Sequence, residues 1–221
     1  MYLWHNYFMN SGLDPRAIAI QPKREAGVQR YKTVLDGADQ LLLEVGLSGF
    51  SISLLAERLG FTRRSIYKFF PTTYAILNEL TYQYLDQLEE LLSNRVTELS
   101  ELPWDKIIYQ MVQEAAAFHN RNPVSRILIL GGAVTDESFR VTELTIRRLG
   151  KLTTDMLNAR GIEPRSHPDV VSLAVDIGTA VFRVSNLYHG EITQDYVDEA
   201  AYAMVAYLSK YIDGQPLNGA P

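Results

Sequence analysis

The sequence predicts an all-α protein of about nine helices, and three observations lead to this fold class. Apolar residues recur at intervals of three and four along most of the chain, as they do on one face of an α-helix. Glycine, proline and capping residue types stand between these segments. We find no alternation of apolar and polar residues between hairpin turns, the pattern that would predict strands. We also find no repeat of fixed period. We therefore expect helices throughout.

The composition is that of an ordinary globular protein. Of the 221 residues 47% are apolar and 21% are charged, so a substantial core can form without disulfide or metal support. The absence of cysteine excludes disulfides, thiolate nucleophiles and cysteine zinc sites, and favours a cytoplasmic location. No export signal is recognised at the N-terminus. The sequence also contains no uninterrupted run of about 18 apolar residues, so neither a membrane-spanning helix nor a membrane partner is predicted.

The charge is distributed unevenly along the chain. The net charge is -5, yet residues 1-70 carry nine Lys and Arg against six Asp and Glu, a balance of +3. Residues 71-221 carry twelve Lys and Arg against twenty Asp and Glu, a balance of -8. An acidic total argues against a protein that coats nucleic acid, but it leaves room for a basic N-terminal region.

The N-terminal elements are an arm followed by a helix. Residues 1-27 contain glycines and prolines without sustained periodicity, so we expect a flexible N-terminal arm. A helix is expected from Arg30 to its stop at Gly46. Its apolar positions have helical spacing: Val34, Leu35, Ala38, Leu41, Leu42 and Val45.

Two short helices follow. The first spans about 53-59, with Ser51 as its N-cap and Gly60 at its end. The second spans 63-70, with Thr62 as its N-cap and Pro71 closing it. Three helices in about forty residues predict one domain, over residues 28-71.

Helical patterns continue over residues 72-213, which we expect to form a second, larger domain. A long helix reaches about Leu99, and the following helices are expected over about 103-119, 124-131, 141-160, 169-188 and 193-212. Residues 214-221 are expected to form a disordered tail.

Residues 30-77 read RYKTVLDGADQLLLEVGLSGFSISLLAERLGFTRRSIYKFFPTTYAIL, and this segment resembles the TetR family of bacterial transcriptional regulators. The matching features are Glu44-x-Gly46, Leu55-Ala56-Glu57 with Leu59-Gly60, and Phe61-Thr62-x-x-Ser65-Ile66-Tyr67-x-x-Phe70. The resemblance implies a helix-turn-helix DNA-binding domain at the N-terminus. It also implies that the larger domain binds a small molecule and dimerises through its last two long helices.

The physical reading of the segment agrees with a helix-turn-helix. A short helix enters the major groove only when a second helix braces it, which explains Ala56 and Gly60 as small residues at a close crossing. Ile66 and Phe70, four residues apart, are expected to face the core with Leu55 and Leu59. The outward residues are then Arg63, Arg64, Tyr67 and Lys68.

These outward residues and the helix N-termini are the expected DNA contacts. Arginine donates bidentately to guanine, so Arg64 is the expected base reader, whereas lysine and tyrosine hold phosphates. The full set of expected contacts is Ser51, Thr62, Arg63, Arg64, Ser65, Tyr67 and Lys68.

Several alternatives stay open for these contacts. Ser51 and Thr62 could act only as caps, Tyr67 could belong to the core, and the basic side chains could be merely solvated. Family members often have glycine at the Arg64 position and lysine near Thr73, so Arg64 could contact a base or a phosphate, and one phosphate contact is in doubt. Lys23, Arg24 and Arg30 could reach the adjacent DNA or serve only solubility.

The larger domain offers weaker signals. Apolar residues on the last two long helices could build a dimeric bundle or an intrachain core: Ala174, Ile177, Val181, Val184, Val197, Ala201, Met204, Val205 and Leu208. An apolar or amphipathic effector could be bound by Trp104, Tyr109, Phe118, Phe139, Phe182, Arg183 and Asn186. His119 is expected at a helix end, as a cation or a cap.

The function that follows is a sequence-specific regulator that binds double-stranded operator DNA as a homodimer. The expected mode is repression, relieved when a small-molecule effector releases a palindromic operator. A regulator without an effector, a helical interaction protein that does not bind DNA, and an enzyme are the alternatives. No HExxH, GxSxG or phosphate-binding glycine loop is present, so neither an enzyme nor a cofactor is predicted.

Overall fold

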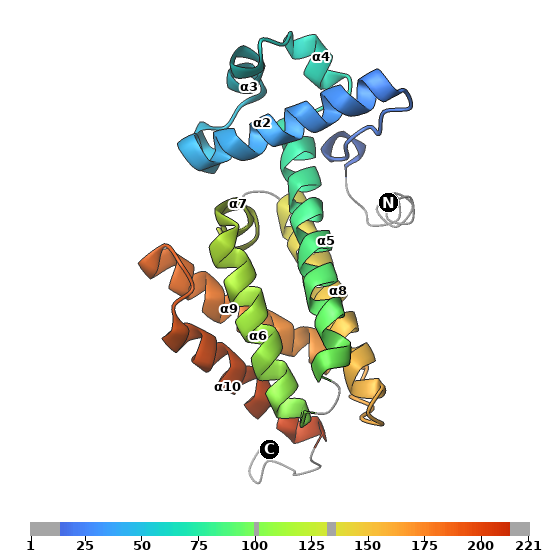
Figure 1. The fold of residues 1–221 in the computed structure, drawn as a ribbon, viewed down its shortest axis with the longest axis vertical. Coiled ribbons are helices and arrows are strands. Elements are labelled where there is room, and N and C mark those ends of the chain that lie inside the picture. Colours follow the sequence, from blue (N-terminus) through green and yellow to red (C-terminus); the bar gives the residue numbers. More distant parts are fainter. Residues whose placement is uncertain (1–13, 100–101, 132–135, 213–221) are drawn as a thin grey trace. The chain divides into compact units, whose positions relative to one another are not determined.

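The computed structural model describes residues 14-99, 102-131 and 136-212, and these residues are helical with no strand (Figure 1). The elements are η1 (Pro15–Ala17), α2 (Glu25–Gly49), α3 (Ile52–Leu59), α4 (Arg63–Tyr67), α5 (Thr73–Leu99), α6 (Trp104–Arg121), α7 (Pro123–Ser125), η2 (Arg126–Leu130), α8 (Asp136–Asn158), α9 (Val170–His189) and α10 (Gln194–Ile212). The predicted all-α class is confirmed. The predicted tail lies outside the described residues.

The chain separates into two compact units, which we call unit 1 and unit 2. Unit 1 comprises the residues up to Tyr84 together with 123-142, and unit 2 comprises 85-122 and the residues from Glu143 onward. The first half of α5 belongs to unit 1 because Ile76 and Leu80 lie in its core. The functional domain limits expected from the sequence, 28-71 and 72-213, stay a prediction.

The core of unit 1 joins four helices and one later segment. Its largest buried side chains come from α2, α3, the residues around α4, and α5: Leu42, Leu55, Ile66, Phe70 and Ile76. Each such side chain contributes about 1.5–3 kcal/mol by leaving water. Val124 of α7 completes this core, so residues 123-130 pack against α2.

The helix α2 begins before the predicted start at Arg30, and its regular part ends at Gly46, as predicted. It starts at Glu25, whose carboxylate lies in the first turn, where the helix dipole favours a negative charge. Gly46 has φ 64° and ψ -176°, so the regular helix stops there, as the sequence predicted.

Residues 14-24, which lie inside the predicted flexible arm, pack on unit 1. Ala17 and Ala19 are buried, and the backbone N–H of Ile20 donates to the carbonyl oxygen of Phe69 at 2.7 Å. This part of the arm is therefore docked, through hydrogen bonds to residues far along the chain. Residues 1-13 lie outside the described residues.

Unit 2 is built on the helical pair α9 and α10, with α6 packed against α10 (Figure 1). The side chain of Asn120 on α6 holds the α9–α10 corner, because its Nδ2 donates to the carbonyl of Ile192 and its Oδ1 accepts the N–H of Ile192. Arg148 of α8 pairs with Asp86 and Glu89 of α5. Asp169 caps α9 by accepting the N–H of Ser172 at 3.0 Å.

Among the described residues, one helix is long and apolar enough to cross a membrane by length and composition, namely α9. The buried core helix of a folded domain meets the same criteria. One side of α9 is buried, with Val171, Ala174 and Phe182 in the interior, and the helix packs along α10.

Candidate nucleic-acid interface

The N-termini of α3 and α4 are fixed by local hydrogen bonds. Ser51 Oγ accepts the N–H of Leu54, and Thr62 Oγ1 accepts the N–H of Ser65, both at 3.2 Å. Ser65 Oγ donates in turn to the carbonyl of Thr62 at 2.7 Å. The capping roles of Ser51 and Thr62 are therefore realised, and contacts from these residues to phosphate stay a prediction.

Gly60 serves the turn between α3 and α4 by its backbone conformation. It has φ 64° and ψ 26°, a left-handed conformation that costs other L-residues about 1–2 kcal/mol. A Cβ added at this position would meet nothing within 4 Å, so the expectation of a close crossing at Gly60 is wrong. Ala56 is buried, and its carbonyl accepts the N–H of Phe61.

The inner face of α4 holds this helix against unit 1. Ile66, Phe70 and Leu55 are fully buried, as predicted, and Leu59 is partly buried. The regular helix ends at Tyr67, three residues earlier than predicted. Lys68 to Phe70 continue as a turn, in which the N–H groups of Phe69 and Phe70 both donate to the carbonyl of Ile66.

Phe69 is a structural residue that the sequence reading did not identify. It is buried, and its ring meets that of Tyr31 edge-on at 6.0 Å between centroids. The apolar pair Phe69-Phe70 at the end of the motif is the signal that could have identified it.

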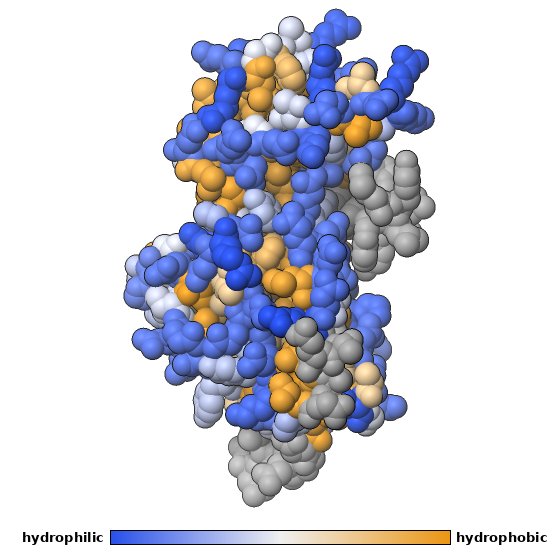
Figure 2. Space-filling model, viewed as in Figure 1, coloured by the Kyte–Doolittle hydropathy of each residue, from blue (hydrophilic) through white to orange (hydrophobic). Residues whose placement is uncertain are grey.

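The outer face of α4 carries the side chains predicted to contact DNA. Arg63, Arg64, Tyr67 and Lys68 are exposed. Tyr67 is 47% exposed, so the alternative of a core role for this residue is wrong. Within the described part of the chain, Arg63 and Arg64 form no ion pair, which leaves their guanidinium groups available to a ligand. Figure 2 shows hydrophilic side chains projecting from the edge of unit 1 formed by α3 and α4.

Further cations lie on α2 and on the segment before it. The guanidinium of Arg30 lies 5.4 Å from the ring centroid of Phe61, which directly precedes the cap of α4. Lys23 and Arg24 are exposed just before α2. The sequence reading had named these three cations but not the contact that places Arg30 beside the start of α4.

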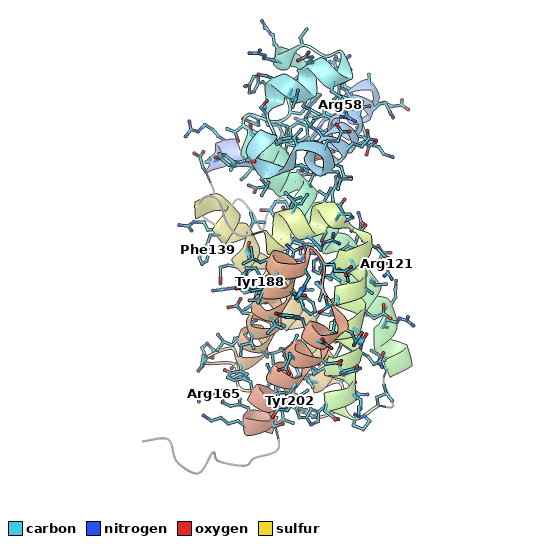
Figure 3. The ribbon with its side chains drawn as sticks, turned by 90° about the vertical axis from the view of Figure 1, so that its left-hand side faces the viewer. Arg58, Arg121, Phe139, Arg165, Tyr188 and Tyr202 are labelled. Atoms are coloured by element: carbon cyan, nitrogen blue, oxygen red, sulfur yellow. The ribbon has the colours of Figure 1, made fainter. Side chains whose placement is uncertain are left out.

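Arg58, in contrast to Arg63 and Arg64, forms an ion pair, and this pair holds α3 to α2. Its two terminal nitrogens donate to the carboxylate of Glu44 at 2.5 and 2.8 Å. The hydrogen bond from Arg58 lowers the pKa of Glu44, and Glu44 raises the pKa of Arg58. This arginine is therefore a brace of the helix-turn-helix (Figure 3).

Two tyrosine–carboxylate contacts tie α2 to the first half of α5. Tyr84 on α5 donates to Asp39 on α2 at 2.5 Å, and Tyr31 on α2 faces Glu79 on α5. Burial and the neighbouring carboxylate raise the pKa of both phenols well above their ordinary value. Both phenols are thus hydrogen-bond donors at every physiological pH.

The structure brings together some of the residues predicted to bind an effector, and their binding role stays a prediction. Phe118, His119 and Phe182 are brought together, with ring centroids 5.7 and 6.5 Å apart. Phe139 belongs to unit 1 and is 57% exposed (Figure 3), so it lies outside this cluster, and its contact with an effector stays a prediction. His119 lies in the last turn of α6, at a helix end as predicted, and its side chain is buried beside the rings of Phe118 and Phe182.

The other members of that set are more scattered. Tyr109 donates to Asp198 at 3.0 Å and accepts a hydrogen bond from Gln113. Trp104 and Asn186 are partly exposed. The Nε of Arg183 is buried without a hydrogen-bond partner. Among the described residues, no cluster of His, Asp and Glu could hold a metal ion.

Of the nine apolar residues expected to build a dimeric bundle or an intrachain core, five are buried, Ile177, Val181 and Val205 are partly buried, and Val184 is exposed. The five buried residues build the intrachain core: Ala174, Val197, Ala201, Met204 and Leu208. The apolar residues left exposed lie on another face of α9 and α10: Leu173, Val184, Leu187, Tyr188 and Tyr202. We call these five residues the α9–α10 stripe, and Figure 3 looks onto its Tyr188 and Tyr202.

Comparison with known proteins agrees with this geometry. Residues 34–80 match the family model described as bacterial regulatory proteins, tetR family. The fold is similar to that of a TetR-family transcriptional regulator from Streptomyces coelicolor, with a TM-score of 0.66 and 23% identity over 82% of this chain and 99% of that one. A TetR transcriptional regulator from Rhodococcus sp. RHA1 is similar with a TM-score of 0.60 and 21% identity over 83% and 98% of the two chains. No curated protein matches the sequence.

The matched segment runs from the middle of α2 to the first half of α5 and includes the whole α3–turn–α4 region. The structural likeness extends well beyond this segment, since it covers 82% of the chain. The helix-turn-helix segment of this chain thus matches the family model of the tetR bacterial regulatory proteins, and the fold of the chain is similar to that of solved TetR-family regulators.

Proposed function

We propose that this protein is a transcriptional repressor that binds a palindromic operator as a homodimer and is released from it by a small-molecule effector. The observation that carries the DNA-binding part is the division of α4 into two faces. Ile66 is buried on one face, while Arg63, Arg64 and Lys68 are exposed on the other. A short, braced helix with an exposed cationic face suits the major groove.

The proposal gives separate roles to the exposed side chains. Arg64 donates to the O6 and N7 of a guanine, which is the commonest specific contact in the major groove. Lys68, Tyr67 and Arg63 bind phosphates and set the docking register. The hydroxyls of Ser51, Thr62 and Ser65 lie at helix starts, where N–H groups and the dipole favour a phosphate.

A homodimer gives these contacts their symmetry. The α9–α10 stripe supports an interface with a second copy, because a partner helix would cover its exposed apolar side chains. A two-fold axis would present two α4 helices to major grooves one helical turn apart. The operator is then an inverted repeat.

Effector release is supported by unit 2 and by the family fold. Aromatic rings and the buried Nε of Arg183 provide an apolar interior with a cationic group. An apolar or amphipathic molecule that binds one conformation better would shift the DNA-bound population, typically by about 1–3 kcal/mol. The proposal places the protein in the cytoplasm and assigns it no enzymatic activity.

Removing the arginines of α4 tests the DNA-binding part. We expect Arg63→Ala combined with Arg64→Ala to lose retention on duplex DNA at moderate salt, with an unchanged circular dichroism spectrum. The matched control is Arg121→Ala with Arg147→Ala, which removes the same charge from exposed positions in unit 2. Equal retention by both double variants would refute the proposal.

The effector part needs its own measurement. Operator affinity is measured with and without fractionated small-molecule pools from cells, and a fraction that weakens binding identifies the effector. If no fraction changes the affinity, the protein is a regulator without a small-molecule effector.

A further inference from the structure

We propose that residues 14-22, which we call the strap, position the recognition helix α4 for base readout. The inference rests on the proposed function, because it concerns how accurately α4 is presented to DNA. The strap precedes α2 in sequence, and its hydrogen bonds reach the turn after α4, the start of α5 and the interior of α5.

The first contact fixes the C-terminal end of α4. The N–H of Ile20 donates to the carbonyl of Phe69 at 2.7 Å, two residues beyond the end of the helix. The ring of Phe69 lies beside Gly27 of α2, whose added Cβ would be 3.6 Å from the ring and 3.1 Å from Pro22 of the strap. The strap and α2 therefore enclose Phe69.

The next contacts tie the strap to α5. Thr72 Oγ1 donates to the carbonyl of Arg16 at 2.8 Å and also accepts the N–H of Ala75 in the first turn of α5. The side chain of Asn78, only 4% exposed, donates to the carbonyl of Ala17 at 3.0 Å. Because buried polar groups left unpaired are costly, this bond holds the strap in one register.

A last contact reaches α2. Gln21 Nε2 donates to the hydroxyl of Tyr31 at 2.9 Å. Tyr31 stacks on Phe70 with ring centroids 4.7 Å apart. The strap is thereby connected to α2, to the end of α4 and to α5.

The need for such a strap follows from the length of α4. A helix of five residues has no stability of its own, since isolated helices shorter than about 12–15 residues are marginal in water. Thr62 caps its N-terminus, whereas no glycine ends it and Lys68 at its C-cap is right-handed. The Ile20–Phe69 bond adds a restraint from outside the helix-turn-helix to this end.

Positioning can be distinguished from simple stabilisation. Base readout requires side chains held to within about 0.5 Å, whereas attraction to phosphates is independent of sequence. A displaced strap should therefore weaken binding to a preferred sequence more than binding to random DNA.

The test replaces Ile20 in two ways. Ile20→Pro removes the N–H and sets a ring carbon against the Phe69 carbonyl, while Ile20→Ala keeps the N–H. The side chain of Ile20 is 52% exposed, so its loss alone changes little. The two readouts are amide hydrogen exchange over residues 63-72 and the ratio of affinities for a duplex selected by the wild-type protein and a random-sequence duplex.

In Ile20→Pro we expect the amide hydrogens of residues 63-72 to exchange faster than in the wild type. The ratio of affinities for the selected and the random duplex should fall about five- to tenfold, as for one lost hydrogen bond. Ile20→Ala should match the wild type. The proposal is overturned if Ile20→Pro keeps the wild-type exchange and ratio, or if Ile20→Ala changes both equally.

A second variant separates positioning from folding. Asn78→Leu removes the donor to Ala17 and should reproduce the effect of Ile20→Pro. If both variants unfold globally, the strap is a folding element and the positioning proposal fails. If the wild-type protein selects no duplex, the proposed function fails, and hydrogen exchange still decides whether the strap holds α4.

Discussion

The two units differ in how closely their functional residues follow one another along the chain. In unit 1 the exposed cations, the caps and the buried anchors of α4 all lie between residues 51 and 70. In unit 2 the aromatic cluster joins α6 to α9, whose residues are more than sixty positions apart. The first arrangement can be read from local sequence rules, whereas the second depends on tertiary packing.

The largest effect should come from the core of unit 1. Phe70→Ala removes a fully buried ring and should lower the free energy of unfolding by about 3–5 kcal/mol. Phe139→Ala is the control, because this ring is largely exposed and its loss should cost less than about 0.5 kcal/mol. Urea unfolding measures both, and similar losses would contradict the assignment of Phe70 as an anchor.

The next effect concerns the α9–α10 stripe. Leu187, which is 77% exposed, should be buried in the homodimer, where Leu187→Glu would place an unpaired carboxylate and cost about 2–5 kcal/mol of association. Analytical ultracentrifugation should then show monomers. Leu43→Glu, the same change at an exposed leucine of α2, should leave the dimer intact. A dimeric Leu187→Glu protein would place the interface elsewhere.

A smaller loss of folding stability is expected from a substitution in the turn before α4. Gly60→Ala forces a side chain into the left-handed region and should cost about 1–2 kcal/mol in thermal unfolding. Gly60→Asn should lose less, because asparagine tolerates this conformation. Equal stability of the alanine variant and the wild type would show that the backbone of the turn can relax.

The smallest effect distinguishes a phosphate contact from a solvated charge. Lys68→Ala should reduce the slope of log affinity against log salt by about one, uniformly across sequences. Lys151→Ala removes an exposed lysine that pairs with Asp155 in unit 2 and should leave the slope unchanged. If the Lys68 variant kept the wild-type slope of log affinity against log salt, Lys68 would be a solvated charge that contacts no phosphate.

The sequence predicted unit 1 well because its signals are local. Ser51, Thr62 and Gly60 mark helix ends through their own side chains or backbone, and the spacing of Ile66 and Phe70 marks the inner face. It missed the docking of residues 14-24, because these residues bond to partners about fifty to sixty positions away, such as Phe69 and Asn78.

Unit 2 shows the limit of the same rules. Helical spacing identified the apolar residues of α9 and α10, but it could not divide them into an intrachain core and an exposed stripe. Of the predicted residues, Ala174 and Leu208 are buried while Val184 is exposed, and the exposed Leu187 and Tyr202 were not among those predicted. Which face is covered depends on the third helix, α6, and no local pattern shows where that helix packs.

The most direct test of the central claim is selection of bound sequences from random duplex DNA by the full-length protein. We expect enrichment of an inverted repeat with half-sites about 10–10.5 base pairs apart, and with a guanine whose preference is lost in Arg64→Ala. Recovery of unenriched sequences by the folded, dimeric protein would contradict the assignment of α4 as a reader of DNA.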